Sequence, residues 1–383
     1  MKTIILVGGV GSRLQSVVKD VPKPMADING KPFLEYLMDN MINFGTSEFI
    51  LCVGYKKEII MDYFKDNFKG IPVKYSIEEE LLGTGGAIKQ AFDLFSLDKA
   101  IIINGDTFVK MDYRAYFEAM KNEKLALALK YVENASRYGL VKTQDDRIVD
   151  FEEKKEIDEA GYINAGIYIV DKSVFNKDLA KKFSFEKEIL EKEIKNLKPR
   201  FFKTEDYFID IGLPESYAEA VKQLKYQIGP KNKALFLDRD GVINIDKHHV
   251  YKIEDCEFVE GIFDLCREYK QKGYLIIVVT NQAGIAKGIY TEDDYYKFRN
   301  HVHEEFKKQN CAIDAEYFCP YHTEGIVEKY KKDSFDRKPN PGMILKAQND
   351  FNIDLENSIL IGDKESDVEA GLKAGIKDCR LKK

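Results

Sequence analysis

Residues 235–244 read LFLDRDGVIN, and this stretch determines how the second half of the chain is interpreted. An apolar run ends in Asp238 and Asp240, which lie two positions apart and therefore point to the same side of a strand. Two carboxylates held that close repel each other unless a cation or a proton lies between them. The pattern predicts a buried strand whose carboxyl end handles phosphate or metal.

Other apolar runs in the second half end in the same way. VVTNQ closes one run with Thr280, whose hydroxyl can bind a phosphate oxygen, and IGDKESD follows another with Asp363 and Asp367. The segment DRKPNPG adds Lys338, a cation suited to a phosphoryl group. Because sheets of this kind carry their chemistry at the carboxyl ends of strands, these groups are expected to meet at one edge.

The first half begins with its own glycine-rich strand end, LVGGVGSRL, from Leu6. Its glycines permit tight turns that present backbone N–H groups to phosphate oxygens, and Arg13 adds a bidentate donor. VPKPM holds Lys23 between two prolines, while NGDTF and FIDIG place Asp106 and Asp210 after β-rich runs. Two carboxylates from separate strands can share one Mg²⁺ that also holds a triphosphate.

Both halves alternate Ile-, Leu- and Val-rich runs with helical stretches, which predicts α/β sheets with crossover helices. Beyond residue 106 the first half changes to strands such as LALALKYV, so its sheet is expected to be mixed. YQIGPKNK marks the border, because a glycine and a proline stand there among polar residues. The prediction is a two-domain α/β protein, with a first domain at 1–226, a linker at 227–232 and a second domain at 233–383.

Composition narrows the function classes. The 383 residues carry a net charge of −6, which gives no reason to expect nucleic acid or a membrane surface as a partner. No apolar run approaches the roughly 18 residues that span a bilayer. The six cysteines form no CxxC pair and are expected to be reduced. We therefore expect a cytoplasmic protein, and the sequence leaves open whether it is a homo-oligomer.

An ordered series of motifs makes residues 1–225 similar to the sugar-nucleotide pyrophosphorylases, the nucleotidyltransferases that act on sugar 1-phosphates. The motifs are the glycine loop, the PKP lysine, LGTGGA, NGD, FEEK, NAG and DIGLPESY. The resemblance implies a Rossmann-like nucleotidyltransferase fold in which the nucleotide is bound by Gly8, Gly9, Gly11, Ser12, Arg13, Lys23, Gly83 and Thr84. It implies that Arg13 and Lys23 are catalytic.

The same resemblance implies Mg²⁺ at Asp106 and Asp210, and the sugar phosphate at Glu152, Lys154 and Asn164. Without it, Glu152 and Lys154 would be interpreted as a solvated pair on a strand edge, because their neighbours are simply charged.

The strand ends of the second half resemble the four-motif pattern of the haloacid dehalogenase-type phosphatases. This resemblance implies a haloacid dehalogenase-like Rossmannoid fold in which Asp238 forms an aspartyl-phosphate and Asp240 acts as acid and base. Thr280 and Lys338 would stabilise the transferring phosphoryl group. The implied Mg²⁺ ligands are Asp238, Asp363 and the backbone carbonyl of Asp240.

DRDGVIN, TNQAGIAKG, YFCPYHTEG, RKPNPGM and GDKESDVEAG resemble the D-glycero-D-manno-heptose 1,7-bisphosphate 7-phosphatases over residues 232–383. The histidinol-phosphatases share much of this pattern. The matching substrate-binding positions are Asn281, Lys287, Arg337 and Lys364. Lys364 also has a plain interpretation as a surface lysine.

One departure concerns the structural zinc loop of that family, C-x-H followed by C-x-C. Tyr321, Ser334 and Asp336 stand at three of the four ligand positions, and only Cys319 remains. One thiolate does not hold a tetrahedral zinc, so we expect none. The change also loosens the inference about which sugar and anomer are used.

Joined in one chain, the two resemblances imply consecutive steps. The second domain would remove the 7-phosphate of the heptose bisphosphate. The first would transfer GMP from GTP to heptose 1-phosphate, giving GDP-heptose and pyrophosphate for a surface polysaccharide. GTP is expected because the first domain resembles the heptose and mannose 1-phosphate guanylyltransferases. Two alternatives stay open: another sugar phosphate with dTTP, UTP or CTP, or one domain that is a degenerate regulatory module.

Overall fold

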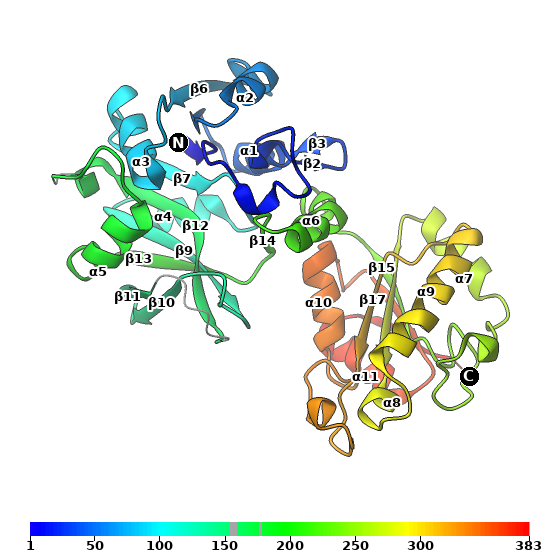
Figure 1. Cartoon of the computed structure of the whole chain (residues 1–383). Coiled ribbons are helices and arrows are strands. Elements are labelled where there is room, and N and C mark those ends of the chain that lie inside the picture. The colour runs from blue at the N-terminus through cyan, green and yellow to red at the C-terminus, as the bar shows by residue number, and fades with distance from the viewer. Residues whose placement is uncertain (153–158, 176–177, 383) are drawn as a thin grey trace. The chain divides into compact units, whose positions relative to one another are not determined.

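The computed structural model describes residues 1–152, 159–175 and 178–382, and the chain separates into two compact units (Figure 1). The first unit is Met1–Ile228 and the second is Gly229–Lys383. The border falls within the stretch that the sequence marks as a linker. Each unit is described by itself.

The first unit is built on a mixed sheet, in which ten strands are found in the described residues in the order β10-β11-β13-β9-β12-β7-β1-β4-β6-β5. The central strands β7, β1, β4 and β6 are parallel, whereas β12 runs antiparallel to both β7 and β9. The bounds are β1 Lys2–Leu6, β4 Glu48–Val53, β5 Asn67–Phe68, β6 Ile71–Ile77, β7 Lys99–Asn104, β9 Leu125–Val132, β10 Leu140–Gln144, β11 Arg147–Glu152, β12 Gly161–Asp171 and β13 Arg200–Thr204. The predicted mixed α/β fold is confirmed.

Helices cover both faces of this sheet because its strands are apolar on both sides. Ile4 and Ile102 pack into one core cluster, and their neighbours Ile5 and Ile101 pack into another on the opposite face. The helices are α1 Phe33–Asn43, α2 Lys57–Phe64, α3 Gly83–Leu94, α4 Tyr113–Met120, α5 Lys192–Leu197 and α6 Pro214–Gln227. Shorter elements are η1 Ser12–Leu14, η2 Lys23–Met25, β2 Asp27–Ile28, β3 Lys31–Pro32, η3 Lys172–Phe175 and the π-helix η4 Glu186–Glu191. A two-stranded ladder of β8 Thr107–Val109 and β14 Phe208–Asp210 completes the unit.

The second unit contains a parallel sheet whose described strands follow the order β17-β16-β15-β18-β19. The bounds are β15 Ala234–Leu237, β16 Leu275–Asn281, β17 Ala315–Cys319, β18 Ile359–Gly362 and β19 Asp378–Leu381. The helices are α7 Ile262–Gln271, α8 Ala283–Ala286, α9 Glu292–Lys308, α10 Gly342–Phe351 and α11 Glu365–Ala374, with 3-10 turns η5 Ile253–Asp255 and η6 Glu328–Tyr330. All four residues of β15 are buried, as expected for the central strand of such a sheet.

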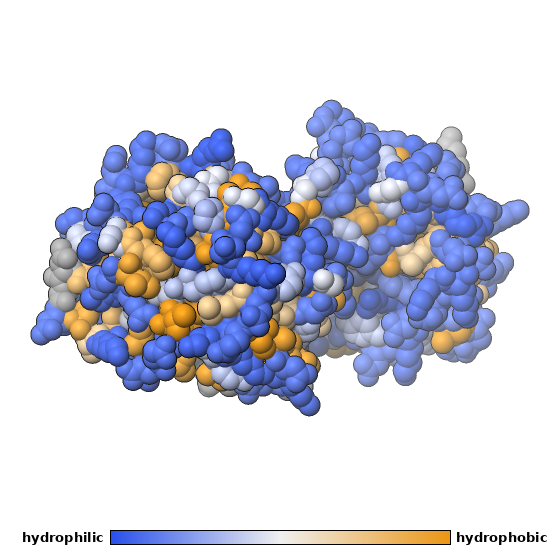
Figure 2. Space-filling model, turned by 90° about the horizontal axis from the view of Figure 1, so that it is seen from above, coloured by the Kyte–Doolittle hydropathy of each residue, from blue (hydrophilic) through white to orange (hydrophobic). Residues whose placement is uncertain are grey.

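The surface of the chain is largely polar. The face seen in Figure 2 is mostly hydrophilic, with hydrophobic residues in scattered groups. In the part of the chain that the structure describes, no helix has both the length and the apolar character needed to cross a bilayer.

Two candidate active sites

A cavity of about 420 Å³ opens at the carboxyl ends of β1 and β7 in the first unit. This volume suits a small-molecule ligand. The cavity brings together most of the residues predicted to bind nucleotide: Gly8, Gly9, Gly11, Arg13, Lys23, Gly83, Thr84 and Asp106. The side chain of Ser12 lies outside what the structure describes.

Gly83 opens α3 at the edge of this cavity. Its φ is +73°, and a Cβ there would come within 2.6 Å of Phe183 O, so only glycine fits without strain. At the start of α3, Gly85 N and Gly86 N donate to Phe183 O over 3.0 and 3.3 Å, and the Thr84 hydroxyl donates to Glu186 Oε2 over 2.6 Å, so these donors already have partners in the protein.

Lys23 joins the two predicted metal-binding carboxylates. Its Nζ lies 2.6 Å from Asp106 Oδ2 and 3.9 Å from Asp210 Oδ1. Burial alone would raise the pKa of Asp106, but Lys23 and the Thr107 hydroxyl hold it below its usual value. Burial raises the pKa of Asp210, and the nearby Asp106 charge raises it further. Such a pair gains from a cation placed between the carboxylates, so the donor set fits Mg²⁺.

Glu78 is a buried carboxylate in the same cavity that the sequence analysis did not single out. Its Oε2 accepts a hydrogen bond from Leu82 N over 2.9 Å, and Oε1 faces the backbone at Gly8. Burial raises the pKa of Glu78. Asn104 lies in the same lining, and its buried Oδ1 has no hydrogen-bond partner among the described residues. Both side chains offer acceptors to a ligand.

Two residues predicted to bind the sugar phosphate, Glu152 and Asn164, do not line this cavity. Glu152 ends β11 and forms an ion pair with Lys142. Asn164 lies on β12, where its Nδ2 donates to the Tyr168 hydroxyl and its Oδ1 accepts from Gly166 N. Lys154 lies outside the described residues.

In the second unit, the carboxyl ends of three adjacent strands bring the predicted residues together. Asp238 follows β15, Thr280 lies near the end of β16, and Asp363 follows β18. Lys338 reaches this edge from a loop. Its Nζ donates to Asp238 Oδ1 over 2.7 Å, to Asp367 Oδ1 over 2.6 Å and to Val279 O over 2.8 Å. All three ammonium hydrogens are therefore used.

The electrostatics of this cluster depend on burial. Burial, the largest effect, together with the Asp367 and Asp240 carboxylates and against the opposing charge of Lys338, raises the pKa of Asp238 to about 7. Burial would lower the pKa of Lys338, but the two carboxylates raise it above its usual value.

Asp238, Asp363 and Asp367 each offer an oxygen within 4.8 Å of the others, the arrangement expected of a divalent-cation site. Asp363 Oδ1 is buried without a hydrogen-bond partner among the described residues, and Gly241 lies so close that a Cβ would meet Asp363 Oδ2 at 2.4 Å. An orphaned carboxylate oxygen in a tight cradle fits a hard cation. Asp367 belongs to this cluster, although the predicted ligand set did not include it.

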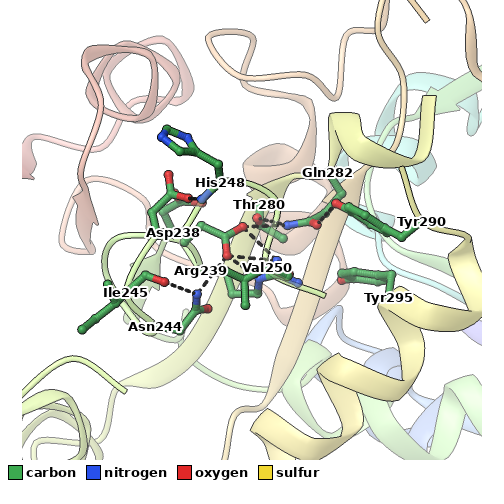
Figure 3. Close-up of polar contacts among 12 residues, drawn as sticks. Asp238, Arg239, Asn244, Ile245, His248, Val250, Thr280, Gln282, Tyr290 and Tyr295 are labelled. Atoms are coloured by element: carbon green, nitrogen blue, oxygen red, sulfur yellow. Dashed lines mark hydrogen bonds and ion pairs between the residues drawn. The ribbon is translucent and has the colours of Figure 1, made fainter. Parts of the chain in front are cut away.

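The Asp240 side chain turns to a different set of partners. Nη2 of the buried Arg239 lies 2.9 Å from Asp240 Oδ2, and Asn244 Nδ2 lies 3.0 Å from Oδ1. Gln282 Nε2 lies 3.2 Å from Oδ2. Figure 3 shows Arg239, Asn244 and Gln282 converging on this group. The Asp240 side chain is thus held by three protein donors.

The predicted substrate-binding residues of this unit have local partners. Asn281 Nδ2 donates to Lys338 O, and Lys338 N donates to Asn281 Oδ1. The Asn281 amide therefore positions Lys338. Arg337 Nη1 donates to Tyr321 O over 3.3 Å. Lys364 Nζ lies 3.3 Å from Asp246 Oδ2, and the Lys364 side chain is 58% exposed.

The positions of the absent zinc ligands form a hydrogen-bonded turn. Ser334 Oγ accepts from Asp336 N, and Ser334 O accepts from Arg337 N. Cys319 is buried with a free thiol. The loop is therefore closed by backbone hydrogen bonds around Ser334.

Sequence reasoning missed Arg239, Gln282 and Glu78. Arg239 lies between the two motif aspartates, and Gln282 follows Thr280 by two positions, the spacing of one strand face. This two-residue spacing is the signal in the sequence that could have identified Gln282. Glu78 begins a run of three glutamates, and nothing in the sequence distinguishes it from the others.

Comparison with known proteins finds relatives for both units. The nucleotidyl transferase family model matches residues 2–227, and the HAD-hydrolase-like model matches residues 335–381. The D-glycero-alpha-D-manno-heptose 1-phosphate guanylyltransferase of Aneurinibacillus thermoaerophilus is 48% identical over 231 residues, which are 60% of this chain and all of that protein. The D-glycero-alpha-D-manno-heptose-1,7-bisphosphate 7-phosphatase of Burkholderia mallei is 54% identical over 146 residues, 38% of this chain and 77% of that protein.

Among solved structures, HddC from Yersinia pseudotuberculosis in complex with GMP-PN matches the chain. It superposes with a TM-score of 0.53 at 40% identity, covering 58% of this chain and 98% of that one.

Proposed function

Because the chain belongs to the nucleotidyl transferase family over residues 2–227 and to the HAD-like phosphatases in its second unit, we propose that it is a bifunctional enzyme that makes GDP-heptose. The second unit hydrolyses the 7-phosphate of D-glycero-α-D-manno-heptose 1,7-bisphosphate. The first unit transfers GMP from GTP to the resulting 1-phosphate. The observation that carries the proposal is the contact of Lys338 with Asp238 and Asp367, which assembles a phosphoryl-transfer site in the second unit, while the first unit contains its own ligand cavity.

In the phosphatase reaction, an Asp238 oxygen forms a bond to the 7-phosphorus while the bond from phosphorus to the sugar oxygen breaks. Asp240 gives a proton to that leaving oxygen and then takes one from a water molecule. The water oxygen attacks phosphorus, the bond to Asp238 breaks, and phosphate leaves. Lys338 and the Thr280 hydroxyl stabilise the charge on the transferring group.

Both families generally use Mg²⁺. In the second unit, Asp238 and Asp363 with the Asp240 carbonyl would hold it, and the orphaned Asp363 oxygen supports this assignment. In the first unit, Asp106 and Asp210 would hold it. When bound, the cation neutralises phosphate charge in either site.

In the transferase reaction, an oxygen of the sugar 1-phosphate attacks the α-phosphorus of GTP in line, and pyrophosphate leaves. The protein forms no covalent intermediate, so positioning carries the rate. The glycine loop and Arg13 bind the triphosphate, and Lys23 moves from Asp106 to the α-phosphate. Glu152, Lys154 and Asn164 are proposed to bind the sugar phosphate.

Glu78 supports GTP as the donor. The base edge of guanine presents two adjacent donors, N1–H and the N2 amine, whereas an ionised carboxylate only accepts. Glu78 Oε1 is available in the cavity because Leu82 N bonds the other oxygen. We therefore assign Glu78 as the base-reading residue.

The order of the two reactions follows from their chemistry, because the phosphatase product is the transferase substrate. GTP and free thiols such as Cys319 suit the cytoplasm, where we expect the enzyme to act.

Phosphorus NMR on the purified chain with Mg²⁺, heptose 1,7-bisphosphate and each nucleoside triphosphate in turn tests the proposal. We expect release of phosphate, and we expect pyrophosphate and a new diphosphate-sugar signal only when the nucleotide is GTP. Phosphate without pyrophosphate would show that the first unit is wrongly assigned. The Asp238→Asn variant should lose phosphate release yet form GDP-heptose from supplied heptose 1-phosphate, and loss of both activities would refute independent sites.

A further inference from the structure

The Gln282 side chain connects two groups of the phosphatase site. It follows β16, is 1% exposed, and its backbone N donates to Cys319 O over 2.8 Å. Its Nε2 donates to Thr280 Oγ1 over 2.8 Å and to Asp240 Oδ2 over 3.2 Å (Figure 3). A carboxamide nitrogen carries two hydrogens, so both are used.

The first of these bonds determines where the Thr280 hydroxyl points. A hydroxyl has one hydrogen and two acceptor lone pairs. Because Gln282 donates to Thr280 Oγ1, the hydroxyl hydrogen must point away from Gln282. Thr280 donates to no acceptor among the described residues, so its hydrogen is left for an acceptor that arrives with the substrate. A phosphoryl oxygen is such an acceptor.

Tyr290 fixes which end of the amide faces the site. The Tyr290 hydroxyl donates to Gln282 Oε1 over 2.5 Å, and burial raises the pKa of Tyr290 so that it keeps this proton. The ring is stacked on Tyr251, with centroids 4.9 Å apart and an interplanar angle of 17°. It also packs against Gly284, where a Cβ would come within 2.1 Å of it. A reversed amide would place Oε1 against the Asp240 carboxylate and lose both donors.

We propose that Tyr290 and Gln282 form a positioning relay that aims the Thr280 hydroxyl at the transferring phosphoryl group and holds the Asp240 carboxylate beside it. Tyr290 and Gln282 act through Thr280 and Asp240, so both are positioning residues. The relay rests on the proposed phosphatase function, because it acts through Thr280 and Asp240.

The relay predicts an effect on kcat rather than on KM. Tyr290→Phe removes one hydroxyl and keeps the ring, and we expect kcat for phosphate release to fall about tenfold with KM little changed. Gln282→Glu keeps the shape but removes both donors, and we expect a loss of about a hundredfold. The matched control is Tyr317→Phe, on the neighbouring strand β17. It removes a hydroxyl that donates to Asp350 Oδ2 over 2.6 Å. Its phosphatase activity should equal that of the wild type.

A double-mutant cycle identifies the route. If the Tyr290 hydroxyl acts mainly through Thr280, then Tyr290→Phe should cost about tenfold alone but much less in a Thr280→Val background. Formation of GDP-heptose from supplied heptose 1-phosphate by the unchanged first unit gives the amount of active chain in each assay. A wild-type kcat in Tyr290→Phe, a change confined to KM, or full additivity with Thr280→Val would overturn the relay.

The substrate assignment is tested separately. If the wild-type chain released no phosphate from heptose 1,7-bisphosphate, the proposed function would fail. The relay would then be measured with p-nitrophenyl phosphate, which needs only the Asp238 site, and the same cycle would decide it.

Discussion

Lys338 Nζ lies 2.7 Å from Asp238 Oδ1, and both side chains are almost completely buried. The contact gives the predicted nucleophile a cation that opposes the effect of burial. Because the pKa of Asp238 is raised to about 7 even with this cation beside it, the charge of Lys338 affects how much of Asp238 is ionised at neutral pH. The position of Lys338 therefore affects the reactivity of Asp238, which lies 100 residues away along the chain.

Lys338→Met should therefore lose at least about a thousandfold in phosphate release, because it removes a phosphoryl-stabilising charge and leaves Asp238 more often protonated. The remaining rate should rise with pH, since removing a nearby cation raises the pKa of Asp238 further. Initial rates measured across the pH range test both statements. Lys346→Met, at an exposed position on α10, is the control. A variant with wild-type rates would contradict the role of Lys338.

Mg²⁺ binding to the second unit should depend on pH. Below about pH 7 a proton occupies Asp238, and a cation must displace it, so the apparent Mg²⁺ affinity should fall by up to about tenfold per pH unit. Above about pH 8 the affinity should be constant. Calorimetric titration of an Asp106→Asn variant isolates this site, and adding Asp238→Asn should remove the dependence. An affinity that stays constant down to about pH 5.5 would show that Asp238 is not a ligand.

Much of both sites could be predicted because their residues follow strands. Asp238, Thr280 and Asp363 end apolar runs, and parallel strands bring such ends to one edge. The partners of these residues could not be predicted in the same way. Gln282 contacts Asp240 across 42 positions, and Asn281 bonds the backbone of Lys338 across 57, because loops of the folded chain bring them together. Only the folded structure distinguishes Glu78 from its neighbours, because its Oε1 packs against Gly8.

Glu78→Gln should change which base the first unit accepts. A glutamine presents an amide nitrogen as well as an oxygen, and that nitrogen meets the donors of guanine unfavourably. We expect kcat/KM for GTP to fall roughly 10- to 100-fold, within the range given by the loss of a base contact. The wild type should also prefer GTP to ITP, which lacks the N2 amine, and the variant should lose that preference. Glu79→Gln is the control, since Glu79 is exposed beside it. Unchanged GTP selectivity would place base recognition elsewhere.

The loop around Ser334 should function without zinc. Cys319 is the one thiolate left at the family's ligand positions, and the backbone of Ser334 closes the loop by accepting from Arg337 N and Asn340 Nδ2. Elemental analysis of the purified chain should therefore find zinc well below one atom per chain. Treatment with EDTA followed by return to Mg²⁺ should restore full phosphate release. Ser334→Ala removes the hydrogen bonds of Oγ to Asp336 N and to the Cys319 thiol, so it should lower the free energy of unfolding by about 1 kcal/mol. One tightly held zinc per chain, with activity lost on its removal, would mean that Cys319 recruits ligands from elsewhere.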